Sequence, residues 1–200
     1  GLFVTLQIAA VSLILAPAFG LISALMRLSG SLLARWAARA YIELIRNTPL
    51  LVQIFFIYFV LSPVFEISAF VSAVLALSLF EGAYASEIFR AGILSIHRNQ
   101  WEAAFSLGLG TWRTYRLVIL PQAIRHILPP LTGQAISLVK DSALVSTIAI
   151  YDLTMQAQAI ISETYLVFEI WFTVAVVYLV MNLLLSVVVA CMEKRLRVYR

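Results

Sequence analysis

The sequence has little charge, a single cysteine and two histidines. Charged residues make up 12% of its 200 positions and hydrophobic residues 62%, whereas a soluble domain is usually about 25% charged. The lone Cys191 excludes an internal disulfide, and no cluster of cysteine and histidine offers a metal site. His97 and His126 fall in a central polar stretch, where we expect them to be solvated. Disulfide-stabilised and zinc-binding domains are therefore excluded.

Several signatures of catalysis are also missing. The sequence has no G-x-x-x-x-G-K-[ST] phosphate loop, so we do not expect the chain to hydrolyse ATP itself. It has neither G-x-S-x-G nor H-E-x-x-H, and no histidine lies inside an apolar run, which argues against an intramembrane enzyme. Internal repeats and low-complexity segments are absent as well. We therefore expect a chain that is not an enzyme and holds no cofactor of its own.

Long apolar runs are what the sequence does have. Leu2–Met26 is uncharged over 25 residues and Ile170–Met192 over 23, and each exceeds the roughly 20 residues that a helix needs to cross the hydrocarbon core. The first run lacks a basic leading region and a cleavage site, so we expect a retained span; the chain begins at Gly1, so we expect a few residues before it. Five spans fit, at about residues 2–26, 41–65, 67–89, 127–157 and 166–192. The pattern predicts an all-α polytopic membrane protein with one domain over residues 1–200.

The basic residues gather in alternate connections between these spans. Thirteen of the fourteen lie before the second span, around the central loop or in the tail. They are Arg27, Arg35, Arg39 and Arg46; Arg90, Arg98, Arg113, Arg116 and Arg125; and Lys194, Arg195, Arg197 and Arg200. By the positive-inside rule this face is cytoplasmic, which places the N-terminus outside and the C-terminus inside. Because the net charge of +4 is divided among three loops beside the membrane, it does not indicate nucleic-acid binding.

The central polar loop, about residues 91–125, carries signals for two short helices. Asn99 followed by Glu102 predicts a capping box at a helix start, and Gly108 suits a left-handed turn at its end. Thr111 is then expected to cap a second helix that runs through Val118 and stops at Pro121. An amphipathic loop of this kind is either a docking surface or a helix that rests on lipid, and local sequence does not decide between the two.

The same loop resembles the EAA loop of permease subunits in ABC importers. That loop consists of Glu-Ala-Ala, three residues, Gly and a distal Leu-Pro. The matching residues here, after the helix start at Asn99, are Glu102, Ala103, Ala104, Gly108, Leu120 and Pro121. In that family the loop inserts into a groove on a separate ATPase subunit. The resemblance favours docking, and it implies that ATP and Mg²⁺ are bound by the ATPase partner.

Four further stretches resemble the polar amino acid branch of these permeases, the histidine/glutamine/arginine/glutamate type. They are ELIRNTPLLVQ at 43–53, the segment from Ala83 to Gly92, VKDSALV at 139–145, and Tyr165, Phe168-Glu169 and Tyr178-Leu179 in the last span. Asn47 stands where glycine is usual, and because asparagine tolerates positive φ we expect the turn there to survive. The resemblance implies a type I ABC importer permease fold with a cytoplasmic coupling helix.

What the family does is implied by the same resemblance. Such a permease sits in the cytoplasmic (inner) membrane of a prokaryote and moves a polar amino acid delivered by an extracytoplasmic binding protein. It works with ATPase subunits and with a second permease chain, identical or a sister. A different class, an ion-gradient-driven amino acid transporter or channel, remains the alternative, although it would leave the loop at Glu102–Gly108 without a purpose. Which amino acid is moved stays open.

Charged side chains inside the predicted spans are the candidates for a substrate path. Glu81 and Lys140-Asp141 lie about 14 and 13 residues into their spans, so at roughly 1.5 Å per residue all are about 20 Å deep. Glu81 or Asp141 is expected to bind the ammonium of an amino acid, and Lys140 with Ser142 its carboxylate. The structural alternative is a fixed Glu81–Lys140 ion pair. Local ion pairs are expected for Glu87 with Arg90 and for Glu43 with Arg46.

Overall fold

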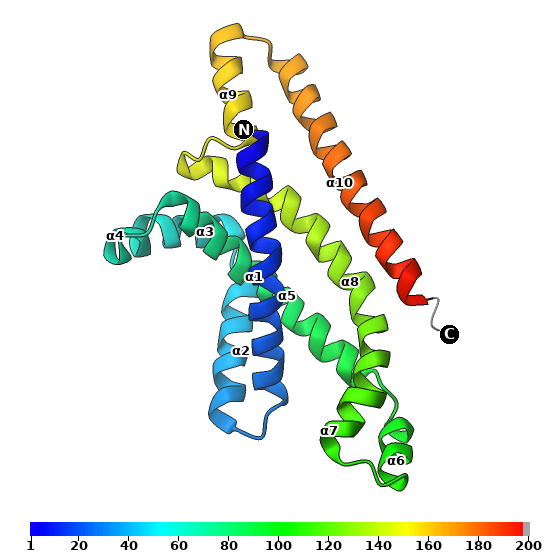
Figure 1. The fold of residues 1–200 in the computed structure, drawn as a ribbon. Helices are drawn as coiled ribbons and strands as arrows, with labels where there is room; N and C mark the ends of the chain where they lie inside the picture. Colours follow the sequence, from blue (N-terminus) through cyan, green and yellow to red (C-terminus); the bar gives the residue numbers. More distant parts are fainter. Residues whose placement is uncertain (198–200) are drawn as a thin grey trace.

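The computed structural model describes residues 1–197 and the side chains of residues 1–191, and every described element is a helix (Figure 1). The basic residues expected in the tail, from Lys194 to Arg200, lie outside the described side chains. Three helices are long and apolar enough to cross a membrane: α1 (Leu2–Leu28), α5 (Ala69–Leu94) and α10 (Val167–Arg197). The count rises to five only when each of two bent helix pairs is taken as one span, so five spans remain a prediction.

Helices α1 and α5 form the centre of the molecule and pack closely along each other. Their contact uses small residues, because a Cβ at Gly20 would lie 2.7 Å from the Ala85 Cβ and one at Gly82 would lie 2.8 Å from the Phe19 Cβ. Small residues let helix backbones approach in a membrane, where the hydrophobic effect does not drive association. By contrast, only 6% of the residues in the apolar stretch of α10 are buried, against 61% in the apolar stretch of α5. Helix α10 is therefore the peripheral span.

The second predicted span, residues 41–65, is not one helix. Helix α2 (Leu32–Arg46) is followed by α3 (Leu50–Phe55), a π-helical segment at Phe56–Leu61 and α4 (Ser62–Phe65), with a bend of 108° between the two parts. The Gln53 Nε2 atom secures the corner by donating to Ile45 O and to Thr48 Oγ1, both at 2.8 Å. The turn expected at Asn47 is present, but without a positive φ, since the φ of Asn47 is −99°. Pro49, which has no N–H group to donate, is the N-cap of α3.

The fourth predicted span, residues 127–157, also has different limits. Helix α8 (Leu120–Asp141) starts earlier and ends at Asp141, where a 3₁₀ segment (Ser142–Ile148) takes over. Ala149 then adopts a left-handed φ of 56°, and α9 (Leu153–Thr164) leaves at a bend of 52°. Figure 1 shows this bend and, at the opposite end of α8, the short helices α6 (Arg98–Ser106) and α7 (Thr111–Thr114). The central loop thus lies at one pole of the molecule.

Candidate coupling loop and substrate path

Helix α6 begins differently from the predicted capping box. Its N-cap is His97, whose Nδ1 accepts a bond from the Asn99 backbone N at 3.2 Å, so Asn99 lies inside the helix. The Glu102 Oε1 atom does not reach back to the helix start and instead accepts from Arg98 Nε at 2.9 Å. The capping box from Asn99 to Glu102 is therefore wrong. Glu102 and Ala103 are both exposed, free to meet another protein.

Gly108 ends α6 in the way expected from the sequence. Its φ is +75°, its N donates to Phe105 O at 2.9 Å, and the next residue, Leu109, donates to Ala104 O at 3.1 Å. A side chain at this φ is strained, which explains the glycine. The expected cap at Thr111 is wrong, because the N-cap of α7 is Gly110, which makes no side-chain bond.

Pro121 does not stop the second helix of the loop. Helix α7 passes through a π-helical segment at Tyr115–Ile119 directly into α8, and Pro121 lies in the first turn of α8. A π-helical segment shifts the hydrogen-bond pattern of the helix, so the residues that follow it can include one that cannot donate. Leu120 and Pro121 therefore lie within one unbroken rod, Thr111–Asp141, which we call the α7–α8 rod. It joins the loop directly to the membrane region.

Part of the apolar face of α6 is buried and part is exposed. Ala104 is 3% exposed, and the Trp101 ring packs edge-on against Tyr115 of the rod with 4.8 Å between centroids. On the outside, the exposed fractions are 47% for Phe105, 81% for Leu107 and 72% for Trp112. We call these three residues the loop patch. Large apolar side chains this exposed at one pole of a molecule mark an interaction surface.

The four candidate residues of the substrate path do not form one cluster. Glu81 is 1% exposed and accepts a bond from Gln134 Nε2, while its Oε1 has no hydrogen-bond partner. Its carboxyl group also interacts with that of Asp141. Lys140 is exposed, and in the described part of the chain no ion pair joins it to Glu81. The fixed Glu81–Lys140 pair is therefore wrong. Ser142 Oγ donates a hydrogen bond to Val139 O at 2.7 Å.

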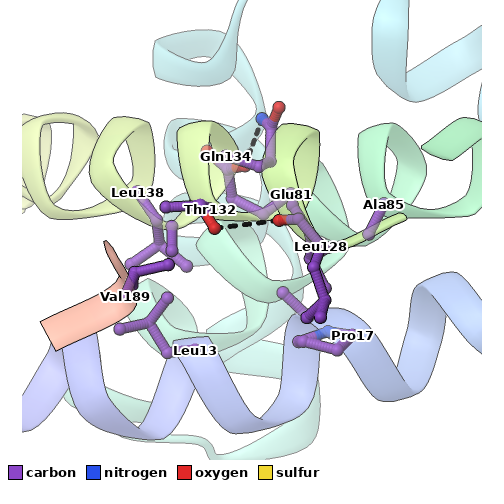
Figure 2. A pocket seen from close by; sticks show the side chains of 12 residues that line it. Leu13, Pro17, Glu81, Ala85, Leu128, Thr132, Gln134, Leu138 and Val189 are labelled. Carbon is purple, nitrogen blue, oxygen red and sulfur yellow. Dashed lines mark hydrogen bonds between the residues drawn. The ribbon is translucent and has the colours of Figure 1, made fainter. Parts of the chain in front are cut away.

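Gln134 is the residue that the sequence analysis missed. It lies seven residues before Asp141, which places both on the same face of α8, toward Glu81 of α5. The spacing was visible in the sequence, but only the packing of α8 on α5 identifies the partner. A cavity of about 350 Å³ lies beside this group (Figure 2), between α1, α5, α8 and α10. Its lining is mostly apolar, including Leu13, Pro17, Leu128 and Leu138, with Glu81 and Thr132 among its polar members.

An ion-pair cluster ties α1 to the same end of α5 as the loop. Glu87 accepts from Arg90 at 2.9 Å, as the sequence predicted, and it also pairs with Arg27 of α1. The expected Glu43–Arg46 pair is not formed, because Glu43 accepts from Asn47 Nδ2 at 3.0 Å and Arg46 lies over the Tyr84 ring, 5.1 Å from its centroid. The motif residues from Glu43 to Thr48 thus shape the corner and its contact with α5.

The profile of one protein family matches residues 16–198, and its description is "Binding-protein-dependent transport system inner membrane component". The chain belongs to this family. It is 41% identical to the glutamine transport system permease protein GlnP of Escherichia coli, over 99% of this chain and 92% of that protein. It is 42% identical to the L-cystine transport system permease protein TcyB of Bacillus subtilis, over 100% of this chain and 86% of that one.

Solved structures agree with the sequence relatives. A crystal structure of an amino acid ABC transporter with histidines superposes with a TM-score of 0.90 at 42% identity, over 98% of this permease and 92% of that chain. An inward-facing structure of the MetNI methionine ABC transporter superposes with a TM-score of 0.78 at 20% identity, over 98% and 94% of the two chains, and shows the same fold. The predicted all-helical type I ABC permease fold and membership of the amino acid importer permeases are confirmed. The gradient-driven alternative is not favoured.

Proposed function

We propose that this permease moves a polar amino acid inward across the cytoplasmic membrane, driven by ATP hydrolysis in separate subunits that dock on the loop of residues 91–125. The observation that carries the proposal is the loop patch, which exposes Phe105, Leu107 and Trp112 at the end of a continuous rod. The relatives named for glutamine and cystine transport support amino acids as the substrate class. ATP and Mg²⁺ are bound by the ATPase partner, not by this chain.

The rod gives docking a mechanical consequence. Because α6 packs on it through Trp101 and Tyr115, a force applied to α6 reaches α7 and α8 without an intervening flexible loop. Its far end carries Asp141, which interacts with Glu81 on α5. Movement of the docked loop would thus change the packing of α8 on α5 at membrane depth. Coupling of the loop to the membrane region then depends on packing, and the charged side chains of the loop need not take part in any reaction.

The remaining assignments follow the family and the basic residues. Residues 1–200 act as a single membrane domain, with the N-terminus outside and the C-terminus in the cytoplasm. A second permease chain, identical or a sister, completes the path, and an extracytoplasmic binding protein delivers the amino acid. Membrane lipid surrounds the assembly. Asp141 or Glu81 binds the ammonium of the substrate, and Lys140 with Ser142 binds its carboxylate.

Co-purification tests the docking. The permease is extracted with its ATPase, and Leu107→Asp is compared with Leu33→Asp, because both leucines are 81% exposed and only Leu107 belongs to the loop patch. We expect Leu107→Asp to lose the ATPase and Leu33→Asp to keep it. Loss in both variants, or in neither, would refute docking through the patch.

A further inference from the structure

Helices α1 and α2 carry four arginines, which fall into two pairs. Arg27 is held in an ion pair, and Arg46 lies over the Tyr84 ring. Arg35 and Arg39 are exposed, and within the part of the chain that the structure describes their side chains form no ion pair, hydrogen bond or ring contact. Figure 1 shows the turn from α1 to α2 toward the same end of the molecule as α6 and α7. Two cations at this end therefore lack a partner inside the described chain.

Arg35 and Arg39 lie on one face of α2. They are four residues apart, so their Cβ atoms lie about 5–6 Å apart and the two positive charges repel each other. Glu43, the one acid in the sequence of α2, does not neutralise them, because it accepts from Asn47 Nδ2 at 3.0 Å. A guanidinium group donates parallel hydrogen bonds to phosphate oxygens, and one phosphate has oxygens for two such groups. The two arginines together thus suit a phosphate.

Large apolar side chains lie beside these arginines on the outside of α2. The exposed fractions are 81% for Leu33, 61% for Trp36 and 64% for Leu44. Together with the exposed Ala40 they recur every three or four residues, so they form one face of the helix, which we call the α2 stripe. Tryptophan is enriched where headgroups meet hydrocarbon, and helices with arginine beside such an apolar face are typical of a lipid surface. The α2 stripe is therefore suited to acyl chains.

The order of the two groups along α2 is that of a phospholipid. Arg35 lies in the first turn of the helix, and Leu44 lies about 14 Å further along. A phospholipid likewise has its phosphate at the membrane surface and its acyl chains below. A second copy of this chain is a poorer partner for the arginines, because two of its acids at this end, Glu87 and Glu102, are already paired.

The opposite face of α2 holds the helix to the protein. Ala38, Ile42 and Ile45 are buried, and the Tyr41 hydroxyl donates to Leu79 O of α5 at 2.6 Å. A molecule bound to the outer face would thus be in contact with a helix that is fixed to α5.

From these observations we propose that Arg35 and Arg39 bind the phosphate of an anionic phospholipid in the cytoplasmic leaflet, and that the α2 stripe lies along its acyl chains. The inference rests on the proposed function for the side of the membrane, and it adds a specific lipid site. A zwitterionic phospholipid binds more weakly, because its ammonium group opposes the two arginines. Each arginine should contribute about fivefold to the preference for the anionic lipid.

Native mass spectrometry of the permease–ATPase complex tests the site. The complex is titrated in detergent with phosphatidylglycerol and with phosphatidylcholine of the same acyl chains. Arg39→Gln should weaken phosphatidylglycerol binding about fivefold and Arg35→Gln/Arg39→Gln about 25-fold, with phosphatidylcholine unaffected. Arg39→Lys should retain most of the affinity, since the charge is kept. Arg113→Gln, which removes the same charge from the loop of residues 91–125, is the control and should leave lipid binding unchanged.

Several results would overturn the inference. They are equal binding of the two lipids by the unsubstituted complex, an equal loss in Arg113→Gln, and displacement of the lipid by inorganic phosphate, which would indicate a site for the free anion. The bound ATPase, seen in the same spectra, shows that each variant is folded. Amino acid uptake by the unsubstituted complex in liposomes separates the two claims. Uptake without a lipid preference refutes only this inference, whereas absence of uptake refutes the proposed function.

A spin label tests whether the α2 stripe meets lipid. With Cys191 replaced by serine, a nitroxide is attached at Leu44→Cys and, as the lipid-facing reference, at Leu183→Cys of α10, which is 55% exposed. Both labels should be relaxed by oxygen, which concentrates in hydrocarbon, more than by a water-soluble nickel chelate. A label at position 44 that neither reagent reaches would mean that a second permease covers the stripe, and one that the chelate reaches more readily would place the stripe in water. Either result contradicts the lipid site.

Discussion

The loop and the membrane region place side chains in opposite ways. At the loop, Leu107 and Trp112 stand exposed where water is expected. At membrane depth, Glu81 is buried and one of its oxygens has no partner. Each arrangement is unfavourable for the isolated chain, and each becomes favourable with a partner: an apolar groove for the loop, a cation for the carboxylate. The difference supports the proposal that each region is completed by a partner, and the α7–α8 rod joins the two regions.

The strongest way to separate the two regions is to disable one and leave the other intact. Asp141→Asn should reduce amino-acid-stimulated ATP hydrolysis by more than about tenfold, since a carboxylate bond to an ammonium is lost, while the ATPase still co-purifies. Asp141→Glu is the control that keeps the charge. Full substrate stimulation in Asp141→Asn would remove Asp141 from the substrate path.

The turn at the end of α6 offers a matched pair of glycines. Gly108 has a φ of +75° and Gly110 a φ of −68°, and neither has a neighbour within 4 Å of an added Cβ. Gly108→Ala should weaken ATPase binding by about 1 kcal/mol, or roughly fivefold, because alanine strains a left-handed turn. Gly110→Ala should bind like the unsubstituted chain. Titration of the ATPase onto both variants measures the difference, and equal affinities would contradict a role for the turn.

The contact between α6 and the rod should affect coupling more than attachment. Replacing Tyr115 by leucine removes the edge-on packing with Trp101, an interaction worth about 1 kcal/mol. We expect fewer amino acids moved per ATP hydrolysed, with the ATPase still bound. Phe80 and Tyr84 form a comparable ring pair, 5.1 Å apart and within α5, so Phe80→Leu serves as the control. An unchanged ratio in Tyr115→Leu would show that this packing carries no force.

The smallest effect is expected at Glu102. Because it pairs with Arg98 on the surface of α6 and does not cap the helix, Glu102→Ala should lower the local stability of α6 by only about 0.3–0.5 kcal/mol. Hydrogen exchange of the α6 amides in the isolated permease measures this, and high salt should abolish the difference. A loss of about 1 kcal/mol or more would restore a capping role.

Much of the fold could be predicted from residue patterns. The apolar runs predicted α1, α5 and α10, and Gly108 predicted the turn, because hydrophobic length and backbone freedom are local properties. A turn at Asn47 was expected, but the 108° bend that divides residues 41–65 was missed, since Thr48 and Gln53 bond across it only once the chain has turned. Pro121 was read as a stop because a π-helical segment cannot be seen in a sequence. Gln134 needed the packing of α8 on α5.

One measurement tests most directly whether the rod couples the loop to the membrane region. Two glycines are inserted between Ile119 and Leu120, inside the rod, and for comparison between Gly30 and Ser31, in the exposed turn between α1 and α2. Uptake and ATP hydrolysis are then followed in the same vesicles. The rod insertion should keep the ATPase attached and hydrolysing but lose uptake, while the turn insertion keeps both. Normal uptake with the rod interrupted would contradict the account.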